Sequence, residues 1–114
     1  VKVVANEGDK VQQWFNQSRN KVVMILKWED GDIDRARIRL KDVELIHNED
    51  YDDYLAPTAI LLLGEGTVKT ASGIEDLPYD TWEIPLTEEL IVELDEDSLN
   101  LSTGQCTYVI ELEE

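Results

Sequence analysis

Four cations spaced two residues apart are the most specific chemical feature of the chain. In a β-strand, residues i, i+2 and i+4 project from one face, so these side chains would form a single row. Like charges in a row repel one another, which implies that anions lie nearby. The favoured interpretation is pairing with carboxylates of the same domain; the alternative is an anion site or a contact for a second subunit. The four residues are Arg35, Arg37, Arg39 and Lys41.

An acidic segment that carries two tyrosines is the second such feature. Carboxylates combined with aromatic rings can present a negative binding surface to a basic protein. A solvated loop is the favoured competing interpretation, because surface loops are ordinarily charged. The acids of 95–97 are a second group that could join this contact. The candidate partner-binding residues are Glu49, Asp50, Tyr51, Asp52, Asp53 and Tyr54.

No metal or cofactor is predicted. Asp30, Asp32 and Asp34 are spaced like the start of a calcium-binding loop, which needs Gly at its sixth position and a bidentate Glu at its twelfth. Those two positions hold Arg35 and Lys41, so the segment is interpreted as a solvated turn. One histidine and one cysteine cannot supply the usual ligand set of a zinc site.

The residue types that catalysis requires do not form a recognisable motif. A nucleophilic Cys106 would need His47 as its base, but Cys106 falls on an apolar strand face, which is typical of a structural thiol. A carboxylate pair stays open, because 26 acids allow many geometries. Such a pair needs one carboxyl in an apolar pocket, and Glu65 and Glu83 are the best candidates.

One helix and a series of strands must position these residues. Over residues 8–20, Val11, Trp14, Phe15 and Ser18 share one helical stripe. The next segment is apolar on both faces, which favours a central strand, and Asp30-Gly31 predicts a hairpin turn after it. We expect a bend at 64–66, a loop over 71–81, and strands over 22–28, 35–47, 58–70, 82–86, 90–94, 98–102 and 105–112.

These elements predict an α+β fold. A length of 114 residues suits one domain, and 42% apolar residues suffice for a core. We expect one N-terminal helix packed on a curled antiparallel sheet or small barrel of six or seven strands. Trp14, Trp28 and Trp82 are assigned to the core, because aromatic side chains dominate small cores.

The net charge of −16 is unevenly distributed. Residues 1–41 hold nine Lys and Arg against six acids, whereas residues 42–114 hold Lys69 against twenty acids. This balance argues against nucleic acid and membrane surfaces as partners, since both attract basic patches. The single cysteine favours a reducing compartment, so we expect a cytoplasmic bacterial protein.

The function best supported by these patterns is a non-catalytic one, in which the chain binds a basic protein. Two alternatives stay open. One is a ligand-binding or enzymatic β-barrel with an interior cavity, and the other is a structural protein that associates with a second copy of itself.

Overall fold

The computed structural model describes residues 3–47, 58–86 and 89–113. In these ranges one helix packs on an open antiparallel sheet of eight strands, so the expected α+β class is confirmed. The elements are α1 (Val3–Gln17), β1 (Val22–Glu29), β2 (Asp32–His47), β3 (Thr58–Thr70), β4 (Gly73–Asp76), the 3-10 turn η1 (Pro78–Asp80), β5 (Thr81–Leu86), β6 (Ile91–Leu94), β7 (Ser98–Ser102) and β8 (Thr107–Leu112). No helix in the described ranges combines the length and apolar character needed to cross a membrane.

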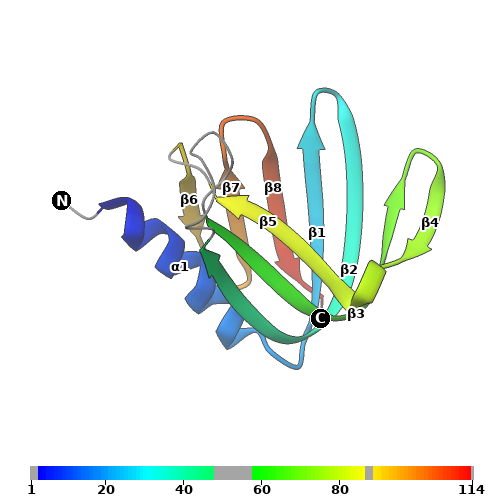
Figure 1. Cartoon of the computed structure of the whole chain (residues 1–114), viewed down its shortest axis with the longest axis horizontal. Coiled ribbons are helices and arrows are strands. Elements are labelled where there is room, and N and C mark those ends of the chain that lie inside the picture. The colour runs from blue at the N-terminus through cyan, green and yellow to red at the C-terminus, as the bar shows by residue number, and fades with distance from the viewer. Residues whose placement is uncertain (1–2, 48–57, 87–88, 114) are drawn as a thin grey trace.

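The strands lie in the order β4-β3-β2-β1-β8-β7-β6, and β5 also pairs with β3. β5 and β4 share one edge of β3, where β5 pairs with residues 58–63 and β4 with residues 67–70. In Figure 1, β3 and β5 sweep across in front of β7 and β8, and α1 lies below β6 and β7. Among the described strands β6 pairs with β7 alone, so the curved sheet does not close.

The expected count of six or seven strands is wrong, and so is the alternative of a small barrel. The additional strand is β4, which falls in the segment expected to be a loop. Its sequence, Gly-Ile-Glu-Asp, has one large apolar residue and therefore no apolar alternation that would predict a strand. All four residues are exposed. Its backbone hydrogen bonds to β3 create it instead.

The helix places the predicted stripe in the core. Val11 and Phe15 are fully buried, and Trp14 and Ser18 are nearly so. The rings of Trp14 and Phe15 meet edge to face, with centroids 5.4 Å apart, and the Ser18 hydroxyl donates to the Trp14 carbonyl at 2.9 Å. The helix begins five residues earlier than expected, at Val3 rather than Gly8. After it, Asn20 adopts a left-handed conformation with φ of 71°.

The close approach of β2 to β3 explains the predicted bend at 64–66. The extra residue of the bend lies in β2, where the pairing register skips Lys41 opposite Gly64 and Leu63. A Cβ atom on Gly64 would collide with the carbonyl oxygen of Arg39, and one on Gly66 with that of Arg37. β2 and β3 can therefore pair this closely only because residues 64 and 66 have no side chain.

We predict that Gly66→Ala lowers the free energy of unfolding by roughly 1–3 kcal/mol, because its Cβ must displace the β2 backbone. Gly8→Ala is the matched control. Its Cβ would meet the Cδ1 atom of Leu86 at an ordinary 3.7 Å, and alanine in a helix gains about 0.5–1 kcal/mol over glycine. Urea unfolding of both variants checks this, and equal unfolding midpoints would contradict the close approach of β2 and β3 at Gly66.

Candidate functional site

The basic row lies on the outer face of the sheet, which we define as the face opposite α1. Arg35, Arg37 and Arg39 are exposed there, while the even-numbered residues between them are buried against the helix. Lys41 is also exposed but occupies the bulge, outside the regular alternation of β2. The structure therefore aligns three of the four predicted cations.

Arg37 is paired within the chain. Its Nε and Nη2 atoms donate to Oε1 and Oε2 of Glu113 at 2.7 and 2.8 Å, so the pair reaches over β1 from β2 to the residue that follows β8. These hydrogen bonds, together with the opposite charges, raise the pKa of Arg37 and lower the pKa of Glu113. Pairing inside the domain thus accounts for Arg37.

Arg35 and Arg39 differ from Arg37 in having no carboxylate partner among the described side chains. Arg39 lies opposite Glu65 of β3, and Arg35 lies opposite Lys69 of the same strand. Neither arginine forms an ion pair with the side chains that the structure describes. Both arginines are exposed on the outer face, and the charge of Arg39 helps to lower the pKa of Glu113.

A hollow of about 460 Å³ opens beside the basic row. Arg37 and Arg39 contribute its cations and Glu65, Asp76 and Asp80 its carboxylates. All five side chains are exposed, so the hollow lacks the apolar shelter that separates the pKa values of a catalytic pair. It can hold water or a small polar group, but its chemistry does not resemble an acid–base centre.

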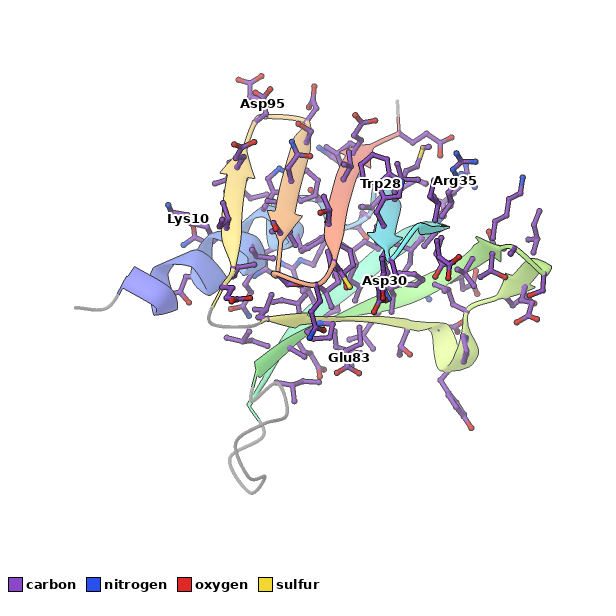
Figure 2. The ribbon with its side chains drawn as sticks, turned by 90° about the horizontal axis from the view of Figure 1, so that it is seen from above. Lys10, Trp28, Asp30, Arg35, Glu83 and Asp95 are labelled. Carbon is purple, nitrogen blue, oxygen red and sulfur yellow. The ribbon has the colours of Figure 1, made fainter. Side chains whose placement is uncertain are left out.

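An apolar row runs along β1 beside the arginines. Met24 and Trp28 are 44% and 43% exposed on the outer face, and Val22 and Leu26 are half-buried there. Figure 2 shows Trp28 and Arg35 on the same side of the sheet. The assignment of Trp28 to the core is therefore wrong, whereas that of Trp14 is confirmed and Trp82 is half-buried. Alternation along a strand that is apolar on both faces does not reveal which face the helix covers.

The acidic turn between β6 and β7 is held in place by the helix. The indole Nε1 of Trp14 donates to the backbone oxygen of Asp95 at 3.2 Å, and the Asp95 amide donates to the Ser98 carbonyl at 2.9 Å. The Asp95 side chain accepts the amide hydrogen of Glu96 at 2.8 Å. Its three acids, residues 95–97, are exposed on a turn whose backbone is fixed.

Acids also gather at the β1–β2 turn. Glu29, Asp30, Asp32 and Asp34 line a hollow of about 260 Å³ together with Lys27, whose Nζ lies 3.4 Å from a Glu29 oxygen. No three His, Cys, Asp or Glu side chains in the described ranges are arranged to hold a metal ion. The predicted acidic segment from Glu49 to Tyr54 lies outside the described residues.

The candidate catalytic residues do not come together. Cys106 precedes β8, near the start of β2, whereas His47 ends β2, so the two lie at opposite ends of that strand. Glu65 and Glu83 are both exposed. Burial and, after it, the charge of Glu29 raise the pKa of the Cys106 thiol, while burial raises the pKa of Tyr108. A raised thiol pKa reduces the fraction of the nucleophilic thiolate at neutral pH.

These features define a small α+β protein in which α1 covers one face of the sheet and no described element covers the other. The chain belongs to the YmzB-like protein family, whose model matches residues 4–114. It is 28% identical over 116 residues to "Uncharacterized protein YmzB" of Bacillus subtilis (strain 168), covering 96% of this chain and 98% of the relative. A bacterial homologue therefore exists. No solved structure matches the chain.

The Arg37–Glu113 pair should make stability depend on pH in the acid range. Because the pKa of Glu113 is lowered by folding, its contribution is full above the unfolded value of about 4.3 and is lost as pH falls through the folded value. We expect Glu113→Gln to lower the free energy of unfolding near pH 7 and to lower it less near pH 2. Urea unfolding at both pH values measures this, with Glu111→Gln as the control; an equal effect of both variants would contradict it.

Cys106 should react slowly with an alkylating reagent. Since its thiol pKa is raised, we expect labelling by iodoacetamide near neutral pH to be slower than in the urea-unfolded chain. Glu29→Gln removes one charge that raises the pKa and should speed the reaction of the folded protein. Equal labelling rates for the folded and unfolded chains would show that the thiol is not protected.

Proposed function

We propose that this protein acts by binding a basic protein partner and does not catalyse a reaction. The observation that supports the proposal is the exposure of its carboxylates: among the described Asp and Glu side chains, all are exposed except Asp34, which is half-buried. Exposed charges of one sign create a field that draws an oppositely charged partner and speeds its association. A net charge of −16 on 114 residues makes that field strong.

Two groups of acids form the proposed contact, at residues 95–97 and in the predicted segment 49–54. The 95–97 turn is fixed by Trp14 and by its own hydrogen bonds, so a partner that contacts it loses little conformational entropy in ordering it. The predicted contact segment, Glu49 to Tyr54, adds two tyrosines, a residue type enriched at protein interfaces. A protein whose own role is to bind nucleic acid is the class of partner with a matching basic surface.

Several features favour binding over catalysis. The open sheet has no barrel interior that could enclose a substrate. The described carboxylates lack the apolar surroundings that tune a general acid, and Cys106 has a raised pKa and lies far from His47 along β2. The cytoplasm remains the compartment we propose, since the lone cysteine suits a reducing environment.

Capture of partners from a bacterial lysate by the tagged protein tests the proposal. We expect a basic protein, identified by mass spectrometry, to bind at low salt and to be released at ~0.5 M salt, where charge screening is strong. Two variants that each remove four negative charges separate local contact from overall charge. One neutralises Glu49, Asp50, Asp52 and Asp53, and the matched control neutralises Glu44, Glu75, Asp76 and Glu83.

The first variant should lose the partner and the control should retain it. Three outcomes count against the proposal. In the first, no basic protein is captured; in the second, capture is insensitive to salt. In the third, both variants lose capture equally, which would attribute it to overall charge rather than to the 49–54 segment.

A further inference from the structure

The outer face carries three parallel rows with different chemistry at the centre of the sheet. The middle row, on β1, is apolar and includes Met24 and Trp28. The row on β2 is basic, and the row that runs along β8 and ends just beyond it is acidic at two positions, Glu111 and Glu113. Arginine, tryptophan and methionine are enriched at protein interfaces, so this composition is unusual for a face that stays in water.

The strand register places opposite charges at equal heights on the two sides of β1. Met24 lies between Arg37 of β2 and Glu111 of β8. One step along, Val22 lies between Arg39 and Glu113, whose amide donates to the Val22 carbonyl. At these two levels a cation therefore lies on one side of the apolar row and a carboxylate on the other, each about 4.8 Å from β1.

This pattern is self-complementary for one particular arrangement of two copies. When two sheets pack outer face to outer face around a two-fold axis parallel to β1, β1 covers β1, and β2 of each copy covers β8 of the other. Arg37 then faces Glu111 of the second copy, and Arg39 faces Glu113. A two-fold axis perpendicular to the strands would instead place arginines on arginines, which the charges oppose.

We infer that the outer face is a homodimer interface, with a two-fold axis parallel to β1. The inference uses other residues than those proposed to bind a basic protein, so either can fail without the other. Three strands about 15 Å across form a patch at the small end of stable interfaces, and two chains of charge −16 repel at long range. We therefore expect a weak dimer with a Kd of roughly 10–100 μM at ~0.15 M salt.

Charge reversal gives a test that depends on the sign. Glu111→Arg makes each chain less negative, which by overall charge alone would favour association, but in the dimer it places arginine against Arg37 twice. Sedimentation equilibrium should therefore show association weakened by about tenfold or more. Glu83→Arg is the matched control, because Glu83 is also exposed, lies on β5 away from Trp28 and Arg35, and its replacement changes the charge identically. The Glu83→Arg variant should still form the dimer.

Mixing two variants tests the geometry itself. Arg37→Glu should also prevent self-association, since it places two carboxylates together. A mixture of the Glu111→Arg chain with the Arg37→Glu chain restores both cross-chain pairs, so we expect a heterodimer from two chains that are each monomeric. Met24→Glu offers a second test that leaves both partners of the Arg37–Glu113 pair in place, and it too should dissociate the dimer.

Several results would overturn the inference. A wild-type chain that stays monomeric up to ~1 mM has no such interface. A dimer that survives Glu111→Arg and Met24→Glu uses another surface. Failure of the mixed variants to associate, with both chains shown to be folded by tryptophan fluorescence, would exclude the parallel two-fold axis.

Discussion

A single helix can cover only one face of a sheet, and this constraint governs how the described part of the molecule is built. The covered face collects Val23, Ile25, Ile38 and Ile110 against the aromatic residues of α1. The other face must carry residues that tolerate water. On β2 the arginines meet that requirement. On β1, however, the apolar side chains of Met24 and Trp28 are exposed, which makes the central strand the unusual one.

The sequence predicted the local elements well, because their signals are local. The helical stripe ending in Phe15 and Ser18 is buried as expected, and Asp30-Gly31 forms the tight turn between β1 and β2, with both φ angles positive. The final hairpin also turns at Gly104, with φ of 89°. Hydrophobic period and turn chemistry act over a few residues, so a single sequence is enough to show them.

Features that depend on distant pairing were not predictable in the same way. β4 exists because residues 67–70 of β3 offer it an edge, and nothing in Gly73–Asp76 itself indicates a strand. Whether the sheet closes depends on whether β6 meets β4 or β5, which local patterns do not encode. The basic row was predicted from its spacing, but Glu113 as the partner of Arg37 was not, since 76 residues separate the two.

The order of the strands has a consequence for biosynthesis. β1 is the first of the described strands, yet one of its two neighbours is β8, the last of them, and α1 is bound to Asp95 through the Trp14 indole. A nascent chain therefore exposes an unpaired, apolar β1 edge until β8 has also left the ribosome. Such long-range closure slows folding, and an unpaired strand edge invites aggregation. Translation that stops before Thr107 would leave this chain with an incomplete sheet, a natural substrate for chaperones and proteases.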